Sequence, residues 1–208
     1  ILDQAARVYP NLRIIRNEIN VGFAAACNAG AAQARGEFLV FLNNDTEPQD
    51  GWLAQMLAVA RQDPTVGIVG SKLLYPDGTI QHAGVGFAER GFKSGNFPWP
   101  FHLHRGEVTR NRSANVQADV QAVTGACLLI PANLFQEVGG FDESYKMYFE
   151  DMDLCMKVSE KGKRIVYVPK SVVVHHEGKS SVNQEAISEL NAESAQQFYT
   201  KWKAVLDR

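Results

Sequence analysis

Apolar residues in the first 70 positions recur in blocks that predict alternating helices and strands. These blocks predict, in order, a helix ending near residue 9, a strand over 12–16, a helix over 23–34, a strand over 38–42, a helix over 52–61 and a strand over 66–70. The 38–42 run, FLVFL, is continuously apolar and ends abruptly in polar residues, as expected of a strand buried on both faces. The alternation is typical of an α/β fold with a mostly parallel central sheet flanked by helices.

The second half of the chain has a different pattern. Residues 87–119 carry Gly, Pro, Asn, His and Arg without a sustained period and predict a long surface loop. The remaining blocks predict a strand over 120–130, a short helix after Pro131, a helix over 149–162, a strand over 164–169 and a terminal helix over 183–206. The chain therefore reads as one α/β domain over residues 1–208.

Composition narrows the class of protein. The 208 residues are 45% hydrophobic and 21% charged, with a net charge of −2, so neither a nucleic-acid partner nor an acidic membrane surface is indicated. No apolar run approaches the roughly 18 residues that cross a bilayer. Three cysteines outside any CxxC spacing, Cys27, Cys127 and Cys155, are expected to be buried thiols in a reducing compartment.

Polar side chains follow the FLVFL strand at the edge where ligands bind in such sheets. Asp45 closes the tripeptide Asn43-Asn44-Asp45, and a carboxylate there can hold Mg²⁺ or Mn²⁺ together with phosphate oxygens. Asp45 can equally close a turn or cap the helix that follows, and the tripeptide alone favours that structural role.

Two further groups could carry chemistry. Glu150, Asp151 and Asp153 crowd three acids into four residues, which suits a general base with a raised pKa or, equally, acids that complement a helix dipole. His175 and His176 follow an apolar run and could ligate a divalent ion, although a structural role is commoner for a histidine in such a place.

The order of five segments resembles the family-2 glycosyltransferases with the GT-A fold, and among them a bacterial rhamnosyltransferase-like branch that builds surface polysaccharides. The segments are NVGFAAACNAGAAQARGEFLVFLNNDTEP, GSKLLYPDGTIQHAG, VTGACLLIP, GGFDESYKMYFEDMDLCMKV and RIVYVPKSVVVHHEGKSS. The resemblance covers the chain except residues 87–119 and the last helix.

The resemblance implies a role for individual residues. Asp45 matches the metal-binding acid of the family's DxD motif, with Asn43 in the first acidic place, and His175 matches a metal-ligating histidine. Asp151, with Glu150 second, matches the base that deprotonates the acceptor. The residues matching the donor-binding positions are Asn20, Gly22, Asn28, Asn44, Gly125, Ala126 and Lys179, with Ser180 beside the last.

The resemblance also implies substrates and surroundings. It implies an inverting transfer from a UDP- or dTDP-linked sugar, with Mn²⁺ or Mg²⁺, to a saccharide or lipid-linked saccharide. The expected location is the cytoplasm, including the inner face of the membrane, where association would be peripheral. The family's opening strand-helix-strand unit, with its base-binding motifs, is not found in the sequence, so we expect a fold truncated at the amino end. Two alternatives stay open: a nucleotidyltransferase, although no Gly-rich phosphate loop is present, and a catalytically incomplete fragment that acts as a binding module.

Overall fold

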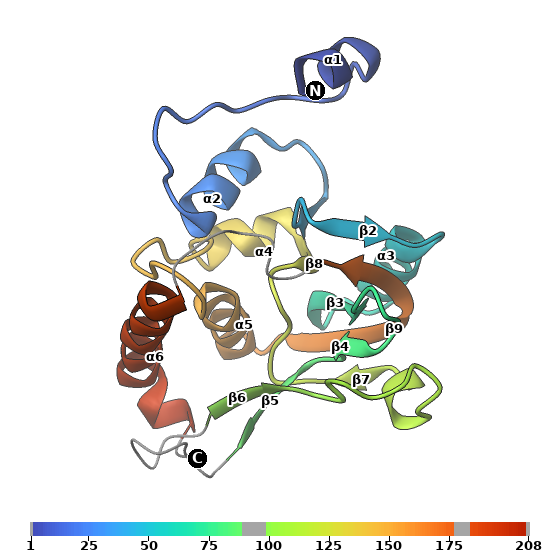
Figure 1. Cartoon of the computed structure of the whole chain (residues 1–208), viewed down its shortest axis with the longest axis vertical. Helices are drawn as coiled ribbons and strands as arrows, with labels where there is room; N and C mark the ends of the chain where they lie inside the picture. Colours follow the sequence, from blue (N-terminus) through green and yellow to red (C-terminus); the bar gives the residue numbers. More distant parts are fainter. Residues whose placement is uncertain (1, 89–98, 177–183, 207–208) are drawn as a thin grey trace.

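A seven-stranded mixed sheet with helices on both faces forms the body of the molecule (Figure 1). The structure is a computed structural model and describes residues 2–88, 99–176 and 184–206. The helices are α1 (Leu2–Val8), α2 (Phe23–Gln33), α3 (Trp52–Gln62), α4 (Ala132–Glu137), α5 (Glu150–Glu160) and α6 (Gln184–Leu206), with a 3₁₀ turn η1 (Ser113–Asn115). The strands are β1 (Phe38–Leu42), β2 (Thr46–Pro48), β3 (Val66–Leu74), β4 (Ile80–His82), β5 (Val85–Ala88), β6 (Trp99–His102), β7 (Ala118–Asp119), β8 (Cys127–Pro131) and β9 (Arg164–His175).

The sheet has the order β1-β8-β3-β9-β2, with β4 paired to β3 and β7 paired to β9. The β3–β9 pair is parallel, whereas β8 runs antiparallel to both β1 and β3. The prediction of a mostly parallel sheet is therefore wrong in detail. β8 lies between β1 and β3, which run in the same direction, and it runs in the opposite direction to both. Because β1, β3 and β9 share one direction, their carboxyl ends meet at one edge of the sheet.

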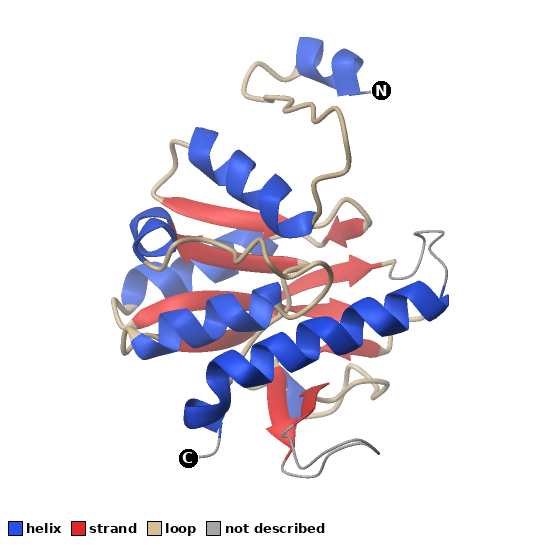
Figure 2. Cartoon of the chain, turned by 90° about the vertical axis from the view of Figure 1, so that its left-hand side faces the viewer, coloured by secondary structure: helices blue, strands red, loops and turns tan. Residues whose placement is uncertain are grey.

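Alternating strand residues feed two separate cores. One core packs the sheet against α2, α4 and α5 and includes Leu39, Phe41 and Leu154, and the opposite core packs the sheet against α3 through Met56 and Ala60. A third apolar cluster joins α5 to α6. Helix α6 packs on the outside of α5 and leads to the C-terminus (Figure 2). The start of α5 is thus held between the sheet and α6.

Two of the expected strands near the amino end differ from the structure. β1 spans the expected residues 38–42, but only alternate side chains are buried, because β1 pairs with β8 alone among the described strands and lies at the sheet edge. Residues 12–16 form no strand, because no described strand runs beside them to accept their backbone hydrogen bonds. With α1 they stand apart from the body (Figures 1 and 2).

The described part of the expected 87–119 loop is more ordered than predicted, and residues 89–98 of that loop lie outside the described residues. Within 87–119 the structure places β6, which pairs with β5 in a hairpin, together with η1 and β7. The strand expected over 120–130 begins only at Cys127, because Gly125 and Ala126 form a turn before β8. Across the described residues, no helix is long and apolar enough for a membrane span. All three cysteines are free thiols; Cys127 and Cys155 are buried and Cys27 is half-buried.

Candidate functional site

A cleft of about 470 Å³ opens at the sheet edge where β1 and β9 end and α5 begins. Its walls come from widely separated parts of the sequence. The lining residues are Asn20, Gly22, Phe23, Asn43, Asp45, Leu73, Gln81, His102, Arg105, Thr124, Gly125, Ala126, Lys146, Met147, Tyr148, Phe149, Glu150, Asp151, Met152 and His175. The three residues with the most important expected roles, Asp45, Asp151 and His175, therefore line one cavity.

Asp45 and His175 meet because their strands pair. Asp45 precedes β2, and the antiparallel β2–β9 register sets Thr46 opposite His175. His175 Nε2 lies 3.2 Å from Asp45 Oδ1, and His175 is 9% exposed. The next residue, His176, turns the other way and places its Nε2 2.8 Å from Glu47 Oε1. Of the two adjacent histidines, only His175 lines the cleft.

Gln81 on β4 fixes the orientation of His175. Its Oε1 lies 2.7 Å from His175 Nδ1, so Nδ1 donates its proton to Gln81 and the lone pair remains on Nε2. That lone pair faces Asp45 Oδ1, a buried oxygen without a hydrogen-bond partner in the described structure. Two electron-rich atoms facing each other are favourable only with a cation between them, either a proton or a metal ion.

The pair has the geometry of two neighbouring ligands of one ion. Ligands at right angles around Mg²⁺ or Mn²⁺, each about 2.1 Å from the metal, lie roughly 3 Å apart, close to the 3.2 Å between Nε2 and Oδ1. No cluster of three or more His, Cys, Asp or Glu side chains suited to a metal occurs in the described ranges. A carboxylate and an imidazole fit an ion that takes its other ligands from phosphate oxygens and water.

The opposite wall of the cleft is the start of α5. Tyr148 and Phe149, just before the helix, both adopt left-handed backbone conformations, with φ of 62° and 70°. Such conformations are costly for residues with side chains and persist only where the surroundings hold them, and Phe149 is 2% exposed within the α5–α6 cluster. This tight entry directs Glu150 and Asp151 toward the cleft.

Two backbone N–H groups donate hydrogen bonds to the carboxylate of Asp151. The backbone N–H groups of Gly125 and Met152 donate to its two carboxylate oxygens, each at 2.8 Å. Burial raises the pKa of Asp151, while these bonds and the nearby His102 oppose that rise. Burial, and then the charge of Asp151, raise the pKa of Glu150. The donors favour ionised Asp151 and protonated Glu150 at neutral pH.

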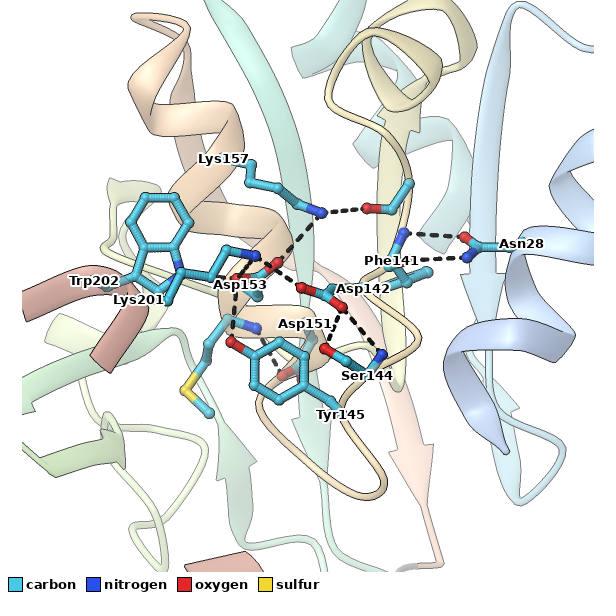
Figure 3. Close-up of polar contacts among 12 residues, drawn as sticks. Asn28, Phe141, Asp142, Ser144, Tyr145, Asp151, Asp153, Lys157, Lys201 and Trp202 are labelled. Atoms are coloured by element: carbon cyan, nitrogen blue, oxygen red, sulfur yellow. Dashed lines mark hydrogen bonds and ion pairs between the residues drawn. The ribbon is translucent and has the colours of Figure 1, made fainter. Parts of the chain in front are cut away.

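Asp153, the third acid of the cluster, points away from the cleft into the contact between α5 and α6 (Figure 3). Its Oδ1 accepts hydrogen bonds from Trp202 Nε1 at 2.8 Å and Tyr145 Oη at 3.2 Å, and it lies 2.7 Å from Lys201 Nζ. Lys157 Nζ lies 3.2 Å from its Oδ2. The acidic cluster thus divides into two residues that line the cleft and one that anchors a helix.

The expected donor-binding residues divide as well. Asn20, Gly22, Gly125 and Ala126 line the cleft, whereas Asn28 and Asn44 do not. The Asn28 amide bonds to the backbone N and O of Phe141 and to Glu143, so it joins α2 to the segment before α5 (Figure 3). Asn44 is exposed at the turn after β1. Lys179 and Ser180 lie outside the described residues.

The structure adds cleft residues to which the sequence gave no role. Gln81 lies in the segment GSKLLYPDGTIQHAG, whose resemblance was visible although no chemistry was attached to it. His102 and Arg105 lie within 87–119, where no pattern distinguished them from loop residues.

Sequence comparisons agree with the geometry. Residues 1–129 match the family described as Glycosyl transferase family 2. "O-antigen biosynthesis protein RfbC" of Myxococcus xanthus is 36% identical over 182 residues, which are 86% of this chain and 14% of that protein. "N-acetylglucosaminyl-diphospho-decaprenol L-rhamnosyltransferase" of Mycobacterium tuberculosis is 30% identical over 192 residues, with 85% and 62% covered. "Uncharacterized protein y4gI" of Sinorhizobium fredii is 39% identical over 84% of this chain, which spans only 19% of that protein.

Solved structures share the architecture. "GalNAc-T7 with UDP, GalNAc and Mn2+" superposes with a TM-score of 0.66 at 20% identity, covering 95% of this chain and 40% of the other. "Mannosyltransferase PcManGT from Pyrobaculum calidifontis in complex with GDP-Man and Mn2+" gives 0.62 at 20% identity, covering 96% and 49%. These likenesses confirm the expected GT-A fold, and the relatives named above confirm the rhamnosyltransferase-like resemblance. The match over residues 1–129, with the fold and the relatives, shows that the chain belongs to glycosyl transferase family 2.

Proposed function

We propose that this chain is the catalytic part of a metal-dependent, inverting glycosyltransferase that moves a sugar from a nucleotide diphosphate to an acceptor hydroxyl. One observation carries the proposal: a candidate metal-binding pair, Asp45 and His175, and a half-buried candidate base, Asp151, line the same cleft of about 470 Å³. A cavity of that size, with few polar groups converging on it, suits a small ligand.

Asp45 and His175 form the donor side of the proposed site. They would hold Mn²⁺ or Mg²⁺, which when bound offsets the negative charge on a departing diphosphate. Gln81 keeps the His175 lone pair directed at that position. The structural neighbours crystallised with Mn²⁺ contain UDP or GDP-mannose, which supports a nucleotide-sugar donor here. We propose a UDP- or dTDP-linked sugar.

Asp151 forms the acceptor side. Its ionised carboxylate accepts the proton of the acceptor hydroxyl while that oxygen attacks the anomeric carbon on the face opposite the diphosphate. Each carboxylate oxygen keeps a lone pair for this proton beside its bond to a backbone N–H. A single displacement inverts the anomeric centre without a covalent enzyme intermediate. Because Glu150 holds its proton, the negative charge of the pair lies on Asp151.

The names of two relatives support a biological role. One concerns O-antigen biosynthesis, and another acts on a diphospho-decaprenol-linked sugar. We propose that the acceptor is a saccharide or lipid-linked saccharide in surface polysaccharide synthesis. A lipid-linked acceptor would bring the enzyme to the inner face of the membrane by peripheral association.

Product analysis tests the proposed reaction. The chain is incubated with Mn²⁺, a panel of UDP- and dTDP-sugars and simple saccharide acceptors, and the released nucleotide is identified. Glycosyl transfer releases the nucleoside diphosphate and forms a glycoside of inverted configuration. Transfer of the nucleoside monophosphate with release of sugar 1-phosphate would assign the chain to nucleotidyl transfer instead. Binding of UDP and Mn²⁺ without turnover of any donor would favour a binding module.

A further inference from the structure

A smaller cavity opens beside the candidate base. Its volume is about 80 Å³, against about 470 Å³ for the cleft. Asp151, Thr124 and Met152 contribute to the lining of both spaces, so the smaller cavity adjoins the cleft at the residue that carries the proposed chemistry. The residues that line the smaller cavity are Val85, Pro100, His102, Thr124, Asp151 and Met152.

Three of the lining side chains are apolar and lie on elements that backbone contacts hold in place. Val85, at the start of β5, is 3% exposed and exchanges backbone hydrogen bonds with Ala122. Pro100 lies on β6, within the β5–β6 hairpin. Met152 follows Asp151 on α5, and its backbone N–H donates to the Asp151 carboxylate at 2.8 Å. The apolar walls are therefore formed before a ligand binds, as is usual for small-molecule sites.

Thr124 adds a hydroxyl to these apolar walls. Its Oγ1 accepts a hydrogen bond from the backbone N–H of Ala126 at 3.3 Å. A hydroxyl that accepts one bond still has its own proton to donate. A ligand group that combines a methyl with a hydrogen-bond acceptor therefore matches the chemistry of this cavity.

The volume of the cavity narrows the choice of ligand group. A water molecule takes about 30 Å³ in the liquid, so a cavity of about 80 Å³ suits roughly three heavy atoms. An acetyl group supplies a methyl carbon, a carbonyl carbon and a carbonyl oxygen. A lone methyl group would leave much of the space empty, and a whole sugar ring is too large for it.

We propose that this cavity is a specificity subsite for the N-acetyl group of an acceptor sugar. The inference rests on the proposed glycosyl transfer, which sets the acceptor on the side of the cleft that holds Asp151. The acetyl methyl lies against Val85, Pro100 and Met152, and the acetyl oxygen accepts the hydroxyl proton of Thr124. Asp151 then takes the proton of a sugar hydroxyl next to the acetamido group.

Methyl NMR tests binding to this subsite without turnover. The chain is labelled with ¹³C-methyl methionine and titrated with N-acetylglucosamine or glucose in the presence of UDP and Mg²⁺. We expect N-acetylglucosamine to shift the Met152 signal at concentrations at which glucose leaves it in place. Met56, which is fully buried in the core on the α3 side of the sheet, is the internal reference. Equal shifts of Met152 with both sugars, no shift with either, or a shift with a 6-deoxy sugar alone would overturn the assignment to an N-acetyl group.

Paired changes in cavity size separate a subsite from simple packing. Val85→Ile adds a methyl group to the cavity, and we expect the affinity for N-acetylglucosamine, measured by ligand-observed NMR, to fall roughly tenfold or more. Val85→Ala enlarges the cavity and should bind N-propionylglucosamine more tightly than the wild type does. Unchanged affinities in both folded variants would contradict the subsite. If Val85→Ala does not fold, Met152→Ala enlarges the same cavity and takes its place.

Thr124 is tested by a second pair of variants. Thr124→Val removes the hydroxyl and should lower the affinity for N-acetylglucosamine roughly three- to tenfold, whereas Thr124→Ser keeps the hydroxyl and the affinity. Equal affinities in the two would contradict the hydrogen bond to the acetyl oxygen. All of these experiments measure binding, so failure of the proposed reaction is distinguishable from failure of the subsite. A chain that binds N-acetylglucosamine at Met152 but transfers no sugar would contradict only the reaction.

Discussion

Glu150 is buried and Asp151 is half-buried at the start of α5, and the surroundings of the two carboxyl groups differ. Backbone N–H groups donate to both oxygens of Asp151. The pKa of Glu150 is raised by burial and then by the charge of Asp151. Two adjacent carboxylates in a low-dielectric site cannot both ionise cheaply, so one of them holds a proton.

Replacing Glu150 with Gln should stabilise the fold, and increasingly so as the pH rises. The folded state keeps the Glu150 proton above the ordinary carboxyl pKa of 4.5, so the wild type loses stability between 4.5 and its raised pKa. Glutamine does not titrate, so it avoids this cost, which is about 3 kcal/mol at pH 7. Urea unfolding from pH 4 to 8 measures the difference.

Glu160→Gln, an exposed change near the end of the same helix, is the control and should show no such trend. A pH-independent effect of Glu150→Gln would show that Glu150 is ionised in the folded state.

Gln81 offers a second prediction at the residue scale. Leucine at position 81 cannot accept the proton of His175 Nδ1, so the imidazole loses its fixed tautomer and orientation. Loss of such a supporting contact typically weakens metal binding roughly 10- to 100-fold. Titration with Mn²⁺ in the presence of UDP measures this change. Gln33→Leu, at an exposed site on α2, is the control. Unchanged Mn²⁺ affinity in Gln81→Leu would show that Gln81 does not support metal binding by Asp45 and His175.

The sequence predicted part of the candidate site for physical reasons. Asp45 and His175 were expected near the ligand-binding edge because they follow apolar runs at strand ends, whereas their metal-binding role was implied by the family resemblance. Asn28 was expected at the cleft but bonds to Phe141 instead, since the direction of a side chain depends on packing that no motif encodes. Gln81 and His102 were missed because they reach the cleft only through strand pairing and a hairpin that the sequence pattern did not reveal.

At the scale of elements, α6 holds α5 in place through buried charge as well as apolar packing. Asp153 is fully buried and meets Lys201 and Trp202 of α6 (Figure 3). Lys201 also bonds Asp142 at 2.9 Å. Burial raises the pKa of Asp142, but hydrogen bonds from Ser144 and Lys201 outweigh it and lower the pKa to about 2. The ion network therefore fixes the helix from which Asp151 extends.

Asp153→Ala should destabilise the protein by about 2 to 3 kcal/mol, because it leaves the buried indole N–H of Trp202 and the ammonium groups of Lys157 and Lys201 without their acceptor. Thermal or urea unfolding measures the loss. Lys146→Ala removes an exposed pair with Glu193, at 3.2 Å, and should cost no more than about 1 kcal/mol. Similar effects of the two changes would show that the buried network contributes little to the docking of α6.

Elements with a strong internal period were predicted well, and those that depend on partners were not. α5 and α6 were expected almost within their observed bounds, because an amphipathic helix satisfies its own backbone and shows its period locally. Strands require neighbours: residues 12–16 have no described partner strand, and β6 exists through its pairing with β5. The direction of β8 likewise depends on tertiary contacts and not on a local sequence pattern. Its antiparallel pairing makes the sheet mixed.

At the scale of the whole molecule, the fold gathers distant residues into one cleft. Asp45 and His175 are joined by the pairing of β2 with β9, and Asp151 is brought opposite them by α5. This chain spans 19% and 14% of the length of two of its relatives, so the cleft is one part of much longer proteins there. The proposed function assigns donor binding and the chemical step to different residues of the cleft, which makes the two separable by experiment.

The central claim is that Asp45 serves donor binding and Asp151 serves the chemical step. Calorimetry with UDP and Mn²⁺, paired with release of nucleoside diphosphate from the best sugar nucleotide, tests it on two variants. Asp151→Asn should keep Mn²⁺-dependent UDP binding within about threefold and lose turnover by roughly 10²–10⁴-fold, whereas Asp45→Asn should lose both. Equal loss of binding in the two variants, or normal binding by Asp45→Asn, would contradict the account.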